Sequence, residues 1–300
     1  RETILRIPKF RIPKYLEVVV ASQRIPTAVG DLHVESDGAG PPAVLWHSLF
    51  VDSTSFELLR PLLAHRRSLI VIDGPGHGRS GASPGPFTLA DCARAAVVVL
   101  DRRGISGPVD WVGNAWGGHV GLTLAADAPQ RIRSLVTIGT PVQAISASER
   151  LRQIYPLVAL YRVVGPIGFT TRALTDALLG AQAVTAQPEL ARRVIDAFRR
   201  ADRRGMFTAM CSAMLRRKAF TRLGEVAAPT LMIAGRDDPT WNVAMAAAAV
   251  AQMPVATSMP SGGAGHVAPL LLNPDFLGRV IAEFWAAPAE HIRSHASAGT

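Results

Sequence analysis

The feature that most constrains the fold is a glycine-rich segment near the middle of the chain, residues 112–119, with the sequence VGNAWGGH. It follows an apolar run of buried-strand type at 109–113 and opens a helix predicted over 115–127. Glycines allow a very tight strand-to-helix turn and close packing of the helix on the strand. Such a turn holds the side chain at position 115 exposed at the carboxyl edge of a sheet, beside a helix N-terminus that favours negative charge.

Apolar runs alternate with helical patterns along most of the chain. Six buried-type strands are predicted, preceded by an antiparallel pair at 16–21 and 31–36; the six are 43–47, 68–73, 109–113, 134–139, 230–234 and 255–258. Thr88 and Asp91 form a capping-box pattern that opens a helix ending near Gly104, and two later helices are predicted at 243–252 and 273–285. Strands alternating with helices predict an α/β fold with a mostly parallel central sheet flanked by helices.

The alternation stops between residues 141 and 222, which are rich in Arg, Leu and Ala and carry no strand pattern. We expect a helical cap there, packed over a core made of residues 16–140 and 223–286. The chain begins with a basic doublet, RIPKF and RIPKY, whose prolines forbid a regular helix, so residues 1–15 are predicted to form an extended arm. Residues 287–300 are expected to be a C-terminal tail with little order.

Four further motifs accompany the glycine-rich segment. They are residues 47–50 (HSLF), 73–80 (DGPGHGRS), 233–239 (IAGRDDP) and 262–266 (GGAGH). Together with the Gly-x-Ala-x-Gly turn, and in this order, they resemble the α/β-hydrolase family, in its cap-bearing branch of esterases, lactonases, C–C bond hydrolases, dehalogenases and epoxide hydrolases. The resemblance covers roughly residues 43–285 and implies the α/β-hydrolase fold.

The resemblance also implies roles for particular residues. The centre of the turn is the nucleophile position of the family, the Ser of G-x-S-x-G, and here it holds Ala115. Asp238 is implied as the acid and His266 as the base that would take a serine proton. The backbone N–H groups of Leu49 and Trp116 are implied as the oxyanion hole.

Alanine has no proton to give and no lone pair for attack, and losing the nucleophile of a triad costs on the order of 10⁶ in turnover. Four explanations stay open. We favour a hydrolase of small, largely apolar ester, lactone or C–C substrates that was inactivated at Ala115, as an engineered substitution would do. The others are a natural serine-less member using the His266–Asp238 dyad as general base (a lyase, a dioxygenase-like enzyme or a water activator), a non-catalytic small-ligand binder, and an epoxide hydrolase inactivated by Asp→Ala.

The substrate pocket is expected between the carboxyl edge of the sheet and the cap. Phe50, Trp241, Tyr155 and Tyr161 are predicted to line it, which would favour an apolar or aromatic substrate. Paired arginines of the cap are interpreted as a solvated helix face, and an anion-binding role for one of them is left open.

The formal net charge of +9 is spread along the chain without a nucleic-acid-binding motif, and the two cysteines have no metal-ligand spacing. We therefore expect a small-molecule substrate as the partner, with no cofactor, no metal, no nucleic acid and no membrane insertion. A cytoplasmic location is expected, and a homodimer is left open.

Overall fold

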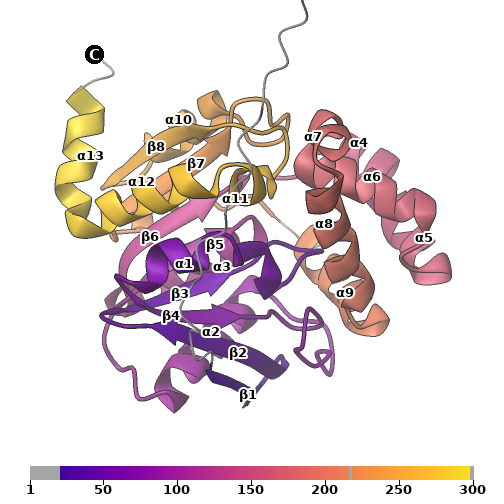
Figure 1. The fold of residues 1–300 in the computed structure, drawn as a ribbon, viewed down its shortest axis with the longest axis horizontal. Helices are drawn as coiled ribbons and strands as arrows, with labels where there is room; N and C mark the ends of the chain where they lie inside the picture. The colour runs from indigo at the N-terminus through magenta and orange to yellow at the C-terminus, as the bar shows by residue number, and fades with distance from the viewer. Residues whose placement is uncertain (1–20, 216–217, 298–300) are drawn as a thin grey trace, which may run out of the picture.

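The computed structural model describes residues 21–215 and 218–297 and is built around one eight-stranded sheet (Figure 1). The strand order is β1-β2-β4-β3-β5-β6-β7-β8. The strands are β1 (Ala21–Thr27), β2 (Gly30–Gly38), β3 (Pro42–Trp46), β4 (Ser68–Ile72), β5 (Val109–Asn114), β6 (Ile132–Ile138), β7 (Thr230–Gly235) and β8 (Ala256–Ser261). β2 runs antiparallel to both of its neighbours and every other pair is parallel, which confirms the predicted mostly parallel sheet.

The opening strand lies later than predicted. Strand β1 spans Ala21–Thr27, whereas the expected range was 16–21, of which only Ala21 falls within the described residues. Pro26 makes this stretch look unlike a strand, because proline cannot donate to a sheet ladder. Among the strands that the structure describes, β1 lies at the edge and pairs with β2 alone, and an edge position tolerates proline.

Successive strand residues divide between two apolar clusters, one on each face of the sheet. In β3, for example, Val44 and Trp46 join one cluster and Ala43 and Leu45 join the other. The first face is covered by α2 (Leu89–Arg102), α3 (Trp116–Asp127) and α10 (Val243–Val250). The opposite face, toward the viewer in Figure 1, is covered by α1 (Arg60–Ala64), α11 (Ala268–Leu272) and α12 (Pro274–Ala286). The sheet is therefore buried on both sides.

The predicted start of α2 is confirmed. The Thr88 hydroxyl accepts from the Asp91 N–H at 3.1 Å, and the Asp91 carboxylate accepts from the Thr88 N–H at 2.8 Å. This reciprocal pair satisfies two backbone donors that the first turn of a helix otherwise leaves open.

The chain between β6 and β7 is mostly helical, with non-helical stretches at 139–146 and 218–222, and its described part contains no strand. Its helices are α4 (Ala147–Glu149), α5 (Tyr155–Val164), α6 (Gly168–Leu179), α7 (Ala181–Ala186), α8 (Pro188–Arg200) and α9 (Arg203–Met210), with π-helical turns at Arg150–Ile154 and Cys211–Leu215. Figure 1 shows them gathered beyond one end of the sheet. The Phe220 N–H donates to the Val142 carbonyl at 2.8 Å, so the beginning and the end of this helical segment lie next to each other.

Two arginines of α8 do not fit the expectation of a purely solvated face. Arg193 pairs with Glu57 at 2.6 Å and Arg200 with the buried Asp52 at 2.9 Å, both on the core side. These ion pairs attach the helical segment to the loop that follows β3.

The C-terminal stretch differs from the expectation of a tail with little order. Helix α13 spans Pro288–Ser297, and Ile292 is buried in the cluster on the face covered by α12. The ring of His291 packs edge-on against Phe284 of α12, with ring centroids 5.6 Å apart. Apolar contacts supplied by α12 thus hold a segment whose own sequence is weakly patterned. The predicted arm at residues 1–15 lies outside the described residues.

Among residues 21–215 and 218–297, no helix has both the length and the apolar character needed to cross a membrane.

Candidate active site

Ala115 occupies a sharply turned backbone position between β5 and α3. Its φ of 45° and ψ of −100° lie outside the regions that side-chain-bearing residues prefer, a conformation that costs roughly 1–3 kcal/mol. The neighbouring glycines explain how the turn forms. A Cβ at Gly117 would lie 2.0 Å from the Trp46 carbonyl oxygen, and one at Gly113 would lie 2.3 Å from the Gly117 carbonyl carbon. Strand β3, strand β5 and helix α3 can approach so closely only because these positions carry no side chain.

Asp238 and His266, far apart in the chain, are hydrogen-bonded. His266 Nδ1 lies 2.9 Å from Asp238 Oδ2, and Asp238 is almost fully buried. The other carboxylate oxygen accepts from the Thr240 N–H at 2.8 Å, the Thr240 hydroxyl at 2.8 Å and the Trp241 N–H at 3.2 Å. Burial alone would raise the pKa of Asp238, but the hydrogen bond and charge of His266 and the hydrogen bonds from Thr240 hold it below its usual value. Asp238 is therefore a carboxylate at neutral pH.

Asn114 ties the His266 loop to the turn that carries Ala115. Its side-chain amide donates to the His266 carbonyl at 2.7 Å and to the Ile138 carbonyl at 2.9 Å. The Ala115 N–H donates to the same Ile138 carbonyl at 2.8 Å. Ala115 and His266 consequently meet at one cavity, which both of them line.

The Thr240 hydroxyl lies close to the imidazole of His266. Its Oγ1 is 3.0 Å from Nε2 and 3.5 Å from Nδ1. An oxygen on the lone-pair axis of Nε2 would be much farther from Nδ1, so Oγ1 lies over the face of the ring. The in-plane direction of Nε2, the one along which a proton is exchanged, is not taken by Thr240.

Two buried histidines fix the loop that contains Leu49. His47 Nε2 accepts from the Gly74 N–H at 2.8 Å, so its Nδ1 carries the proton and donates to the Ser48 carbonyl at 2.6 Å. His77 Nε2 accepts from the Phe50 N–H at 3.3 Å. Burial lowers the pKa of His47 and lowers that of His77 to about 3, so both rings are neutral acceptors at physiological pH.

The segment 73–80 folds around the buried carboxylate of Asp73. The buried Asp73 carboxylate accepts from the Ser53 N–H at 2.8 Å and the Arg79 N–H at 3.0 Å, and it pairs with His33 at 3.1 Å. Burial opposes its charge, yet these donors hold the pKa of Asp73 well below its usual range. A Cβ at Gly78 would lie 2.4 Å from this carboxylate, so the loop can fold around Asp73 only with glycine there.

The two backbone N–H groups expected to form an oxyanion hole have no acceptor in the described parts of the chain. Leu49 and Trp116 both line the cavity beside Ala115, while the next N–H along, that of Gly117, donates to the His47 carbonyl at 3.1 Å. Trp116 is the first residue of α3, whose N-terminal N–H groups have no partner within the helix. Two donors therefore remain available next to position 115.

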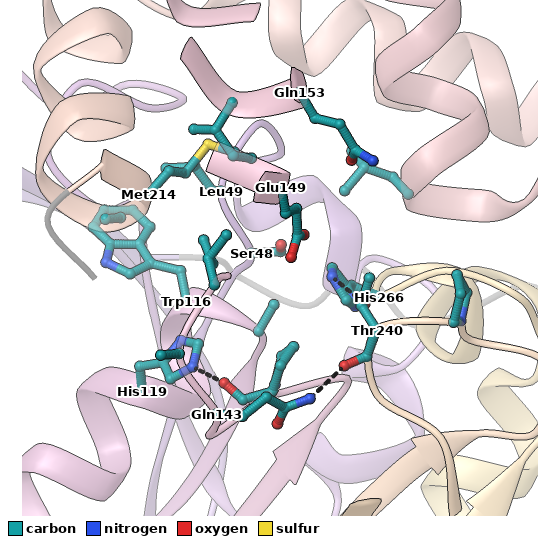
Figure 2. Close-up of a pocket in the computed structure, with 18 of the residues that line it drawn as sticks. Ser48, Leu49, Trp116, His119, Gln143, Glu149, Gln153, Met214, Thr240 and His266 are labelled. Atoms are coloured by element: carbon teal, nitrogen blue, oxygen red, sulfur yellow. Dashed lines mark hydrogen bonds between the residues drawn. The ribbon is translucent and has the colours of Figure 1, made fainter. Parts of the chain in front are cut away.

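The cavity has a volume of about 640 Å³ and lies between the sheet edge and the helical segment, as expected (Figure 2). Its lining from the core comprises Ser48, Leu49, Phe50, Ala115, Trp116, His119, Pro239, Thr240, Met245 and His266. From the chain between β6 and β7 it adds Pro141, Gln143, Ala144, Ile145, Ser146, Glu149, Gln153, Ile154, Leu178, Ala213 and Met214.

Of the four predicted substrate-contact residues, the structure places only Phe50 in the lining. Trp241 is fully buried in the core, since the turn after Asp238 directs Thr240 and not Trp241 toward the cavity. Tyr161 is buried against Phe198, with ring centroids 5.3 Å apart, and Tyr155 is about half exposed on the outer side of α5. The predicted lining positions of Trp241, Tyr155 and Tyr161 are therefore not found in the structure; for the two tyrosines the reason is that a sequence pattern does not reveal which way helix α5 is turned toward a cavity.

Several polar lining residues were not predicted from the sequence, among them Thr240, Gln143 and Glu149. Thr240 follows the acid by two residues, and its position is set by the turn in which Asp238 accepts from its N–H. Gln143 donates to the Thr240 carbonyl at 3.0 Å (Figure 2). Glu149 stands three residues after Ser146, a spacing that usually indicates helix capping.

A family model described as the α/β hydrolase fold matches residues 41–271. A protein named as the carbamate hydrolase RutD of Azorhizobium caulinodans is 36% identical over 108 residues, a match that spans 36% of this chain and only 40% of that relative. The pimeloyl-[acyl-carrier protein] methyl ester esterase of Xanthomonas oryzae is 27% identical over 85% of this chain and 99% of its own length. A thermophilic esterase from Thermogutta terrifontis superimposes with a TM-score of 0.81 at 23% identity, covering 90% of this chain and 99% of that one. This chain is therefore a member of the α/β-hydrolase superfamily of enzymes.

Proposed function

We propose that the site is that of a serine-type hydrolase for small, largely apolar esters, lactones or C–C substrates, in which residue 115 is the nucleophile position. As it stands, with Ala115, the chain binds such a substrate without forming a covalent intermediate. The observation that carries the proposal is the strained backbone of Ala115, held at the cavity that His266 also lines. Strained backbone of this kind clusters at active sites, where it positions a reacting side chain, and it costs free energy wherever it has no such role.

With serine at position 115, the chemistry would follow from the contacts described above. Nε2 of His266 would take the serine proton as Oγ attacks the carbonyl carbon of the substrate. Asp238 would keep the proton on Nδ1 and stabilise the imidazolium ion. The N–H groups of Leu49 and Trp116 would bind the oxyanion, and the imidazolium would then protonate the leaving group. Water activated by the same imidazole would release the acyl group.

The substrate class is inferred from the lining and from the relatives. Most of the cavity wall is apolar, with Leu49, Phe50, Trp116, Ile145 and Met214 among its larger members. The names of two relatives refer to carbonyl substrates, a carbamate and a methyl ester. Hydrolysis of a small ester is consistent with both.

We assign the helices between β6 and β7 the role of a cap, with residues 141–222 as its extent and residues 16–140 and 223–286 as the catalytic core. Contributions to the cavity wall from Ile145, Leu178 and Met214 support this division. A cytoplasmic location accompanies the proposal.

A second candidate function uses the Asp238–His266 pair alone. Because Asp238 stays ionised and Thr240 leaves the in-plane direction of Nε2 open, the imidazole has what a general base for water or for a substrate proton requires. This candidate requires no side chain at position 115.

Two variants separate these candidates. Ala115→Ser and Ala115→Asp are assayed beside the Ala115 protein on panels of esters, lactones, C–C substrates and epoxides, each also with His266→Ala. Ester turnover that appears with serine and is lost with His266→Ala supports the hydrolase. Turnover by the Ala115 protein that depends on His266 supports the second candidate, and epoxide opening only with aspartate supports an epoxide hydrolase. Ala115→Ser that folds and hydrolyses nothing would overturn the proposal.

A further inference from the structure

The charge inside the cavity is opposite in sign to the charge of the chain. The chain carries 32 Lys and Arg against 23 Asp and Glu. The described residues that line the cavity nevertheless include no lysine and no arginine, and their one carboxylate is that of Glu149. An anionic substrate would therefore meet no compensating cation among these lining residues, and two arginines of α8, Arg193 and Arg200, are engaged elsewhere, with Glu57 and Asp52.

Glu149 points into the cavity and is not committed to the fold. It ends the short helix α4, where its backbone N–H donates to the Ser146 hydroxyl at 3.1 Å. In a complete capping box the glutamate carboxylate would also accept a hydrogen bond from the Ser146 backbone N–H, but α4 lacks this second bond. Figure 2 shows the side chain directed down from α4 into the cavity, toward the side where Ser48 and His266 lie. Within residues 21–215 and 218–297 its carboxylate has no hydrogen bond and no ion pair.

A carboxylate in this position has a defined effect on binding. Glu149 is only partly exposed and shares the cavity lining with apolar residues such as Ile145 and Ile154, and partial shielding from water strengthens its interaction with a ligand charge. A cationic group placed beside it gains a charge interaction, whereas an anionic group is repelled. A neutral group of the same shape gains neither.

We propose that Glu149 is a specificity-determining residue that forms a cation-accepting subsite, so that the preferred substrate carries a positively charged nitrogen in addition to an apolar body. This inference rests on the proposed function, because it names the substrate class of the same site. Binding does not require a nucleophile, however, so it can be tested with the Ala115 protein.

The test compares three ligands of similar size: benzyltrimethylammonium, its neutral isostere neopentylbenzene, and the anion phenylacetate. Dissociation constants are measured by titration calorimetry or ligand-observed NMR for the Ala115 protein, Glu149→Gln and Glu189→Gln. Glu189 is an exposed α8 carboxylate outside the cavity lining, so its variant changes the net charge equally. We expect the ratio of cation affinity to neutral affinity to fall about fivefold in Glu149→Gln, as a partly exposed charge contact of about 1 kcal/mol implies, and to stay within twofold in Glu189→Gln.

Four results would overturn the inference. Two concern the cation itself: it binds no better than its neutral isostere, or it shows no detectable binding at concentrations of about 10 mM. Two concern the variants: the affinity ratio is unaffected by Glu149→Gln, or it falls equally in Glu189→Gln. Neutral-ligand binding by Glu149→Gln reports whether the cavity is intact in that variant. Failure of the proposed function has a different signature, namely Ala115→Ser that discriminates between the ligands but hydrolyses no ester.

Discussion

Replacing Ala115 by glycine tests whether the turn is strained. The φ of 45° and ψ of −100° imply a strain of roughly 1–3 kcal/mol that glycine would relieve. Against this gain, the variant loses a buried methyl group worth about 0.8 kcal/mol and pays about 0.4–1 kcal/mol for the freer unfolded chain. The net change in the free energy of unfolding should therefore lie between a loss of about 0.8 and a gain of about 1.8 kcal/mol.

Ala96 provides the matched control. It is fully buried in the middle of α2, in ordinary helical conformation, so Ala96→Gly loses the same methyl group and about 1 kcal/mol of helix propensity with no strain to relieve. We expect Ala96→Gly to destabilise the protein by about 2 kcal/mol, leaving a gap of roughly 1–3 kcal/mol between the two variants. Guanidinium unfolding followed by tryptophan fluorescence measures both, with equal m-values as the condition for comparison. Equal destabilisation by the two substitutions would refute the strain argument.

Three further outcomes are expected. Gly117→Ala should cost more than about 3 kcal/mol of unfolding free energy, because its Cβ would lie 2.0 Å from the Trp46 carbonyl; a loss below 1 kcal/mol in the same unfolding assay would contradict the close approach. In the Ala115→Ser background, Asp238→Asn should lower kcat on an ester about 10⁴-fold, since the imidazole loses its orienting anion; unchanged kcat would exclude that role. Burial lowers the pKa of His77 from 6.5 to about 3, so below pH 6.5 the unfolded chain binds a proton that the folded chain does not, and stability should fall as pH drops from about 6.5 toward 3; an NMR titration with a midpoint near 6.5 for the folded His77 ring would contradict this.

The sequence was most informative where chemistry demands fixed spacing. The turn around Ala115 could be recognised because only glycine fits at 113 and 117, and Asp238 and His266 stand at fixed places after their strands. The buried pairing of Asp238 with His266 agrees geometrically with that expectation. Their catalytic roles remain part of the proposal.

The cavity wall was the least predictable part, because it depends on how helices are oriented. Tyr161 and Tyr155 are close in sequence, yet one is buried in the helical segment and the other faces outward. The spacing of Glu149 from Ser146 is also that of a capping box, so the sequence pattern alone does not indicate a place in the cavity wall. Tertiary packing decides whether such a carboxylate accepts a hydrogen bond from the N-cap backbone N–H or points into a cavity. A local sequence pattern carries no information about that packing.

The hydrogen bond from Phe220 to Val142 has an evolutionary consequence. This bond brings the two ends of the helical segment together, so the segment leaves the core and returns to it at almost the same place. The entropy of closing a loop grows only slowly with its length, so helices can be added, lost or exchanged above this closure without moving Asp238 or His266. Selection for a new ligand can therefore act on one contiguous stretch of sequence, while the parts of the chain that carry Asp238 and His266 are inherited unchanged.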